Sequence, residues 1–424
     1  MRVAHWTICA DYRSGMAMTC RELVAAQKAL GFDSEIINAM DPKNSVTDGR
    51  DKTETHHYAQ GADLYVLHSH IPEPWFSDGT PTIVMLHGMP HYTWETEAYL
   101  LEGSNTAPFS QVMSYFQNPN IKRFVTMWSP QLATWDILDG YQGRTRFVQN
   151  GIDLDFYSLD GPKKKLAGQP VMLIADQARM CKDPFLMAFG AEWFRSHYAP
   201  EAQMHIVGMP PIGTGNRSRD RWENLLENSG LKKCCASRHG IVNDLPEFYR
   251  ASDILLTSSP DESRVVKEAI ALGMDVVSPF LNTAHLTEES LELAQAPPDA
   301  LREHLGGMYC APRSQGHQGA HMAVEHERAA PIWQTVNAVD AEVLAAQIAE
   351  TWEVRSKDPD ARRELLAEFA RRRYDVSRTA AGMIEVYQDV MAETGGHPII
   401  GGMQADESNV GNAPAGAPVG SRDG

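Results

Sequence analysis

Three acidic residues near position 260 lie in a polar segment and in the helix that is predicted to follow it. Asp261 and Glu262 lie in the polar segment, and Glu268 falls within the first turns of the predicted helix. A carboxylate at the position of Glu268 can accept hydrogen bonds from both hydroxyls of a ribose. Acidic residues at a helix start are also common caps, so the residues alone leave both interpretations open.

Two cations, Arg179 and Lys182, follow a predicted strand at 170–175 and lie beside a predicted helix start. Guanidinium and ammonium groups pair well with phosphate oxygens, so the two could bind a diphosphate. Such pairs are as often solvated surface charges.

A histidine and a glycine each follow a predicted strand, where open α/β sheets bind ligands. His87 comes directly after Thr82–Leu86 and could bond a sugar hydroxyl or a phosphate oxygen, or only cap a loop. Gly15 lies between the first strand and its helix, where the missing Cβ lets a phosphate reach free N–H groups. A tight strand-to-helix turn would also place a glycine there.

Histidines and cysteines give no metal-site spacing. His317 and His321 are four residues apart, but Gly316 and Gly319 argue against a rigid helix. The six cysteines contain no Cys-x-x-Cys pair, so they are expected to be free thiols in a reducing compartment. We therefore predict no metal ligands and no tightly bound cofactor.

Short apolar strands alternate with helical patterns along two successive stretches of chain, which predicts an α/β protein with two parallel sheets. The predicted strands of the first stretch are 3–9, 33–38, 64–68, 82–86, 123–128 and 145–148, and those of the second are 170–175, 203–207, 237–240, 254–257 and 275–278.

Composition bounds the remaining possibilities. The formal net charge is -17, which disfavours a broad surface for nucleic acid or anionic membrane. Apolar runs are too short to span a bilayer, and the first residues do not have the pattern of a signal peptide. We therefore expect a soluble, cytoplasmic protein.

Five segments, in this order, resemble family 4 of the retaining glycosyltransferases (glycosyl transferases group 1), which have the GT-B fold. One is the turn Asn150-Gly151-Ile152-Asp153, similar to the family's interdomain turn. The others are 205–208 before the donor loop, 240–249 near the nucleotide base, 251–259 before the signature helix, and 371–387 in the closing helix.

The resemblance implies two Rossmann-like domains facing across a cleft. These are an acceptor domain at 1–157, completed by a C-terminal helix at 380–393 that crosses back, and a donor domain at 158–379. An irregular insertion would span 282–339, and a disordered tail 395–424.

The implied reaction transfers a sugar from a nucleotide diphosphate sugar, with a UDP-sugar favoured, to a hydroxyl acceptor without a metal ion. The acceptor would be a glycan or a lipid-linked sugar. The implied catalytic residues are His87, Arg179, Lys182 and Glu262, and the implied donor-binding residues are Gly15, Val242, Asp261, Arg264, Val265 and Glu268.

Two positions depart from the family pattern. The signature is Glu-x7-Glu, and Glu268 matches its second glutamate, but Pro260 stands at the place of the first. We expect Glu262 to replace it while Asp261 caps the helix. Lys182 fits the family's lysine, whereas Gln177 occupies the place of its arginine, for which Arg179 can substitute.

Two alternatives remain. The first is a glycosyltransferase that modifies a nucleic-acid base, as some viral GT-B enzymes do. It is disfavoured because residues 1–150 carry 11 Lys and Arg against 16 Asp and Glu. The second is a catalytically silent GT-B-like protein that only binds a nucleotide sugar, motivated by the two departures.

Overall fold

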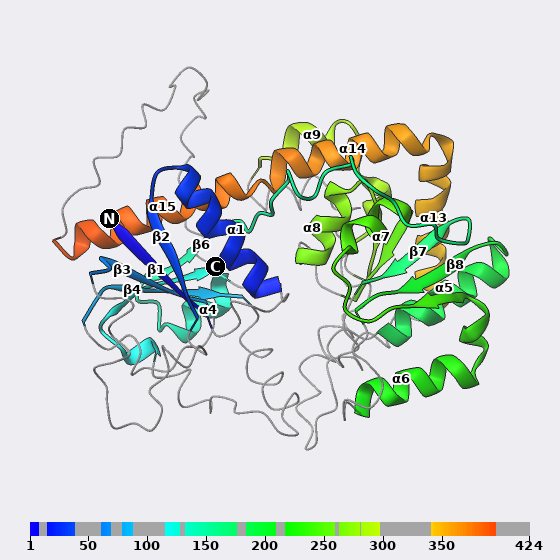
Figure 1. Cartoon of the computed structure of the whole chain (residues 1–424), viewed down its shortest axis with the longest axis horizontal. Coiled ribbons are helices and arrows are strands. Elements are labelled where there is room, and N and C mark those ends of the chain that lie inside the picture. The colour runs from blue at the N-terminus through cyan, green and yellow to red at the C-terminus, as the bar shows by residue number, and fades with distance from the viewer. Residues whose placement is uncertain are drawn as a thin grey trace, which may run out of the picture.

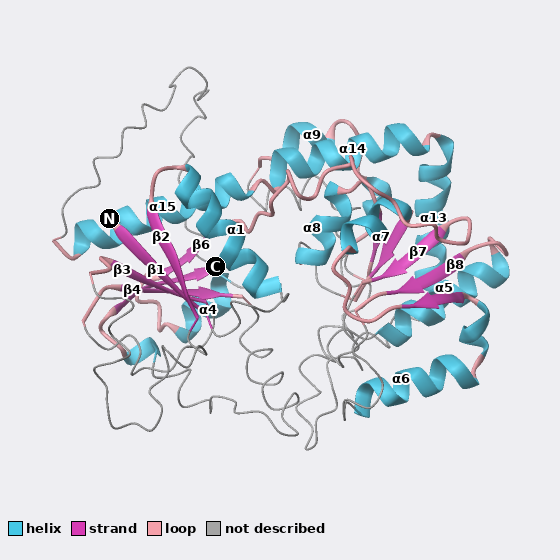
Figure 2. Cartoon of the chain, viewed as in Figure 1, coloured by secondary structure: helices cyan, strands magenta, loops and turns pink. Residues whose placement is uncertain are grey.

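A computed structural model describes residues 1–7, 15–38, 61–68, 79–87, 115–127, 132–175, 184–208, 217–258, 263–279, 281–296 and 341–395. Strands and helices alternate in both halves of the chain, and each half contains one parallel sheet (Figures 1 and 2). No helix in these ranges is both long and apolar enough to cross a bilayer.

The first sheet has the strand order β2-β1-β3-β4-β5-β6. The order reverses between β1 and β3, and ligands of open α/β sheets bind outside the carboxyl ends at such a point. The bounds are β1 Arg2–Thr7, β2 Asp33–Asn38, β3 Leu64–His68, β4 Thr82–Leu86, β5 Ile121–Thr126 and β6 Thr145–Phe147.

Both faces of the first sheet are covered. Helices α1 (Gly15–Ala29) and α15 (Val376–Glu393) cover one face, where Leu23 and Met383 pack against strand residues such as Val66. On the other face, Trp135 of α4 (Leu132–Leu138) joins a second apolar cluster. Burial on both sides explains why these strands are continuous apolar runs rather than alternating ones.

The second sheet has the order β11-β10-β7-β8-β9, so its strand order reverses between β7 and β10. Its bounds are β7 Val171–Ile174, β8 Gln203–Ile206, β9 Cys235–Arg238, β10 Ile254–Leu256 and β11 Asp275–Val277.

Helices cover both faces of the second sheet. Residues of α5 and α13 share one apolar cluster with the strands, and residues of α7, α8 and α14 share the other. The bounds are α5 Pro184–His197, α6 Arg217–Asn228, η4 Gly230–Lys233, α7 Leu245–Ala251, α8 Arg264–Ala271, α13 Ala341–Lys357 and α14 Pro359–Arg373.

The chain passes between the two halves twice, and the two passages are hydrogen-bonded to each other. The Ile152 N–H donates to the Tyr374 carbonyl at 2.7 Å, and the Val376 N–H donates to the Ile152 carbonyl at 3.1 Å. A Cβ on Gly151 would lie 2.7 Å from the backbone of Asp375. The Asn-Gly turn therefore needs its glycine for this close approach of two backbones.

Most predicted strands agree with the structure, and those at 33–38, 64–68 and 82–86 match to the residue. Two are displaced by two residues toward the N-terminus. β5 begins at the buried Ile121, and β9 begins at Cys235, which pairs with Met204 where the register is irregular. The start of the predicted insertion is ordered, with a 3-10 turn η5 (Thr283–His285) and helix α9 (Ser290–Leu293).

Candidate active site

The first residues of α1 and α8 meet between the two sheets. A Cβ built on Gly15 would lie 3.6 Å from Cδ of Arg264, which is ordinary van der Waals contact. Helix α1 is the element that follows β1, and α8 is the element that follows β10, so helices that come after the carboxyl ends of the two sheets face each other here (Figure 1). Two of the predicted donor-binding residues, Gly15 and Arg264, are thus brought together.

Arg264 forms ion pairs with a carboxylate from each half of the chain. Its Nη2 lies 2.5 Å from Oε1 of Glu22 on α1, and its Nη1 lies 3.0 Å from Oε2 of the same residue. Its Nε lies 2.7 Å from Oε1 of Glu268, one helical turn further along α8. We call these three residues the interdomain triad.

The interdomain triad is shielded from solvent. The side chains of Arg264, Glu22 and Glu268 are 10%, 8% and 6% exposed. Burial raises the pKa of Glu22 against the opposing effect of Arg264. Burial would lower the pKa of Arg264, but the two carboxylates hold it above its ordinary value. The guanidinium is therefore a permanent cation whose charge depends on both partners for compensation.

Three further groups surround the interdomain triad. The Asp153 N–H donates to Glu22 at 3.2 Å, the Tyr249 hydroxyl donates to Oε2 of Glu268 at 3.3 Å, and the ring of Tyr157 lies 5.6 Å from Cζ of Arg264. Asp153 and Tyr157 belong to the passage between the halves. The same contacts thus connect the interdomain turn with the start of α8.

Two other predicted donor-binding residues are not members of the interdomain triad. Val265 is half-buried against the apolar cluster of α8, and Val242 packs at the edge of that cluster. Val242 also lines a hollow of about 460 Å³, together with Lys164, His205 and Phe248, that neither Arg264 nor Glu268 lines.

His87 lies directly beyond β4, as predicted, and is half-buried. Its Nε2 is 3.0 Å from Nδ1 of His68 at the end of β3. Burial lowers the pKa of His87 to about 4, so the ring is neutral at pH 7. A neutral imidazole can accept one hydrogen bond and donate another.

Four predicted site residues fall outside the described ranges, namely Arg179, Lys182, Asp261 and Glu262. The strands that precede them are β7 and β10, which are the two strands between which the order of the second sheet reverses.

Glu22 and His68 are not singled out by their sequence context. Glu22 lies seven residues after Gly15, two helical turns along the same face of α1, and that spacing is the local signal for it. His68 ends a predicted strand, as His87 nearly does. Among the described residues, one group has ligand atoms close enough to hold a metal ion, namely His5, Cys20 and His68.

No family model matches the sequence, and no curated protein matches it. Solved structures match over nearly the whole chain. A glycosyltransferase from Rickettsia africae covers 92% of this chain and 98% of its own, with TM-score 0.57 and 14% identity. The Anabaena protein HepE, in complex with UDP and glucose, covers 91% and 99%, with TM-score 0.53 and 13% identity.

A third similar structure is an alpha-glucosyltransferase in complex with UDP and a 13-mer DNA. It covers 91% of this chain and 98% of its own, with TM-score 0.54 and 11% identity. The chain has the GT-B fold. The predicted fold class is therefore confirmed, and the Gly15–Arg264 contact lies where the two Rossmann-like units of this GT-B chain meet.

Proposed function

We propose that this GT-B protein is a retaining glycosyltransferase that transfers a sugar from a nucleotide diphosphate sugar, with a UDP-sugar favoured, to a hydroxyl acceptor. The observation that carries this proposal is the meeting of α1 and α8 at Gly15 and Arg264. Solved GT-B neighbours that bind UDP support it. In the reaction the bond from the anomeric carbon to the diphosphate breaks, a bond from that carbon to the acceptor oxygen forms, and the proton of the acceptor hydroxyl passes to the departing diphosphate.

Positive charge is required where the diphosphate leaves, because catalysis in such sites is mainly positioning and charge stabilisation. The N-terminus of α1 at Gly15 is the positive end of the helix dipole, which suits an anion. Arg179 and Lys182 would supply the remaining charge. No metal ion is needed in this scheme, since these groups together balance the diphosphate.

Glu268 would accept the ribose hydroxyls of the donor. Its Oε1 faces Arg264, whereas its Oε2 accepts one long bond of 3.3 Å from Tyr249. A carboxylate oxygen has room for a second donor, so Oε2 is the atom that we assign to the ribose. Arg264 then acts by holding the carboxylate in place.

Calorimetric titration with UDP tests the donor site. A bond to a charged group contributes about 1.5–3 kcal/mol, so Glu268→Ala should weaken UDP binding by roughly tenfold or more. Glu288→Gln, at an exposed position on the same half of the chain, is the matched control and should bind like the unchanged protein. Equal affinity of a folded Glu268→Ala protein would remove Glu268 from the donor site.

Turnover separates an enzyme from a silent binding protein. Incubation with UDP-sugars should release UDP and free sugar slowly without an acceptor, and faster with one. Binding of UDP without any release of sugar would support the catalytically silent alternative.

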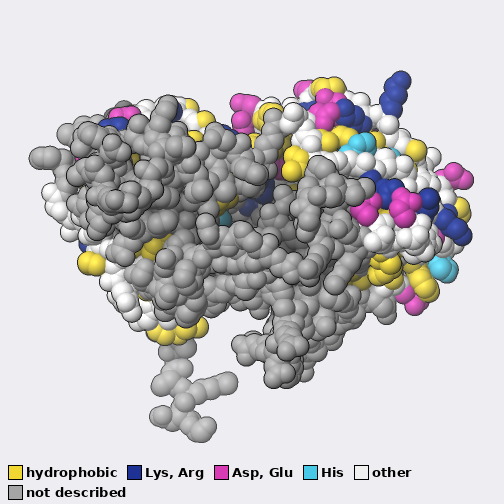
Figure 3. All heavy atoms as spheres, turned by 60° about the horizontal axis from the view of Figure 1, so that its bottom comes forward, with side chains coloured by type: hydrophobic (Ala, Val, Ile, Leu, Met, Phe, Trp, Pro, Cys, Tyr) yellow, Lys and Arg dark blue, Asp and Glu magenta, His cyan; other side chains and the backbone are white. Residues whose placement is uncertain are grey.

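A glycan or lipid-linked sugar remains our proposed acceptor class. Residues 1–150 carry 11 Lys and Arg against 16 Asp and Glu, a balance that suits a neutral acceptor better than a polyanion. In Figure 3 the basic and acidic side chains that can be seen lie beside one another, mostly over the second half of the chain. Transfer to duplex DNA, assayed beside oligosaccharides, would overturn this choice.

A further inference from the structure

Three histidines form a diagonal row on one face of the first sheet. His5 lies in β1, His68 ends β3, and His87 follows β4. In the strand register His68 pairs with Thr7 and with Met85, so each histidine stands two residues nearer the carboxyl edge than the one before. Steps of two residues keep all three side chains on the same face, beneath α1 and α15.

The rings of this histidine row are hydrogen-bonded in series. His5 Nδ1 lies 2.9 Å from His68 Nε2, and His68 Nδ1 lies 3.0 Å from His87 Nε2. His5 and His68 are fully buried. Burial lowers the pKa of His5 to about 4 and that of His68 well below its ordinary value, so these rings are neutral at pH 7.

Gln27 of α1 holds the buried end of the histidine row. Its Nε2 donates to the Tyr387 hydroxyl at 2.7 Å, and its Oε1 accepts from the Ser34 hydroxyl at 2.7 Å. The same Oε1 lies 2.9 Å from His5 Nε2. Since a carbonyl oxygen only accepts, His5 must carry its proton on Nε2.

A neutral imidazole has one donor and one acceptor nitrogen, so the position of the proton on His5 determines its position on His68 and then on His87. His5 Nδ1 accepts from His68 Nε2, which leaves His68 Nδ1 to accept from His87 Nε2. The last ring is left with a lone pair on Nδ1. Among the described residues, no partner occupies that atom.

We propose that Gln27, His5 and His68 are positioning residues that fix His87 as its Nε2–H tautomer, so that Nδ1 accepts a hydrogen bond from a sugar hydroxyl. The inference rests on the proposed function, because it names the substrate group that His87 contacts. His87 is the member of the row nearest the carboxyl edge, on which Gly15 also lies. The tautomer itself is independent of any ligand.

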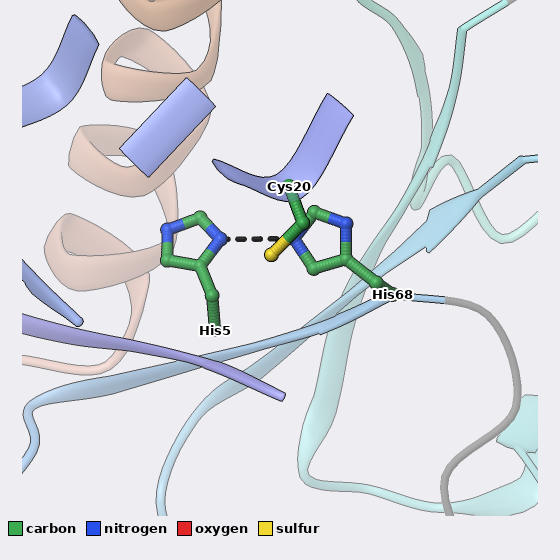
Figure 4. Close-up of side chains that lie close together, drawn as sticks. All are labelled: His5, Cys20 and His68. Atoms are coloured by element: carbon green, nitrogen blue, oxygen red, sulfur yellow. Dashed lines mark hydrogen bonds between the residues drawn. The ribbon is translucent and has the colours of Figure 1, made fainter. Parts of the chain in front are cut away.

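Cys20 of α1 provides the competing interpretation. Figure 4 shows its sulfur beside the contact between His5 and His68, and the three ligand atoms lie within 4.8 Å of one another. A cation there would be bound by His5 Nδ1 and His68 Nε2, the two atoms that are joined by a hydrogen bond in the histidine row. His68 would then carry its proton on Nδ1 and donate to His87 Nε2, which reverses the tautomer of His87.

Two observations favour the hydrogen-bonded row. The 2.9 Å separation of the two nitrogens suits a hydrogen bond, whereas two ligands at about 2.0–2.1 Å from a tetrahedral zinc ion lie further apart. Burial also raises the pKa of Cys20 to about 12, so the thiol keeps its proton at pH 7.

Nitrogen NMR of the full chain labelled with ¹⁵N-histidine tests the proposal directly, since protonated and unprotonated ring nitrogens give well-separated signals. His5, His68 and His87 should each be protonated on Nε2, and Cys20→Ala should leave this pattern unchanged. Single histidine variants assign the signals. A proton on Nδ1 of His87, or one transition-metal ion per purified chain, would overturn the proposal.

Kinetics of paired variants test the link to the substrate. His5→Gln can donate to Gln27 and accept from His68 in the same sense, whereas His5→Leu cannot. We expect His5→Leu to lower kcat/KM for transfer about tenfold and His5→Gln to restore it to within about twofold. UDP affinity should stay unchanged in both. An equal fall in kcat/KM in the two variants contradicts the proposal. If the unchanged protein does not bind UDP, the proposed function is contradicted instead.

Discussion

The histidine row also makes stability depend on pH. Burial lowers the pKa of His5 and His87 to about 4 and lowers that of His68 well below its ordinary value, whereas an unfolded histidine titrates near 6.5. In this window the unfolded chain binds more protons than the folded chain. The free energy of unfolding therefore falls as the pH falls from about 6.5 towards 4, by up to about 1.4 kcal/mol per pH unit for each histidine.

Urea unfolding at several pH values measures this slope. His5→Gln should reduce it by the contribution of one proton. Ser34→Ala removes a neighbouring hydrogen bond but no titrating group, so it should shift the whole curve without changing its slope. A slope that is the same for His5→Gln and the unchanged chain would contradict the prediction.

The acidic residue that replaces the first signature glutamate remains a prediction at this scale. The structure places Ser263, and not Asp261, at the N-cap of α8, so the predicted capping role of Asp261 was wrong. We expect Glu262 to face the donor, because it has the longer reach. Glu262→Gln should then lower turnover with little loss of stability, whereas Asp261→Ala should leave both turnover and melting temperature nearly unchanged. Assays of turnover and melting on both variants decide this, and loss of turnover in Asp261→Ala alone would give the role to Asp261 instead.

At the scale of elements, the interdomain turn depends on Gly151. A Cβ built on this glycine would lie 2.7 Å from the backbone at the start of α15. Gly151→Ala must therefore push the two passages apart, and overpacking of this kind costs about 1–3 kcal/mol. Thermal unfolding should show the loss. Gly230→Ala is the control, because nothing lies within 4 Å of its built Cβ, and its melting temperature should not fall.

Elements were more predictable from sequence than contacts between them. The strands of both sheets are short apolar runs bounded by polar residues, so period and burial define them without tertiary information. β5 and β9 were displaced because apolar residues continue past β5 and because an irregular register moves β9. Strand ends depend on pairing partners that a single segment does not contain.

Site residues followed the same rule. The places of His87 and Gly15 in the fold could be predicted because a strand end and a strand-to-helix turn are local patterns. The partners Glu22 and His68 could not, since Glu22 meets Arg264 across 242 positions of sequence. Four predicted site residues lie outside the described ranges, so their roles stay predictions: Arg179, Lys182, Asp261 and Glu262.

The interdomain triad connects the halves at the scale of the whole molecule. Glu22 and Glu268 both depend on Arg264, so removing one carboxylate leaves part of a buried charge without compensation. We expect Glu22→Ala to lower the free energy of unfolding by about 3–5 kcal/mol. The double variant Glu22→Ala with Arg264→Met should lose less than the sum of the losses in the two single variants, because each single change leaves the other residue of the Glu22–Arg264 pair without its partner. Glu268 loses its cation equally in Arg264→Met and in the double variant.

Denaturant titrations of the single and double variants measure this coupling. Glu247→Ala changes a half-buried carboxylate that pairs with Lys164 within one half of the chain, and it should cost far less. An additive double variant would show that Glu22 and Arg264 do not interact energetically.

The position of α15 has a consequence for the order of folding during synthesis. Met383, Tyr387 and Val390 of α15 complete the apolar cluster of the first sheet, yet α15 begins at Val376 and the last strand of that sheet ends at Phe147. At a ribosomal rate of about 5–20 residues per second, that sheet waits roughly 10–50 s for its covering helix. During this interval α1 covers part of the apolar face, but the part that α15 will cover is exposed, while the second sheet already has its own strands. Nascent chains arrested before residue 376 should therefore engage chaperones through the first half of the molecule, and those extended past α15 and clear of the ribosome should release them.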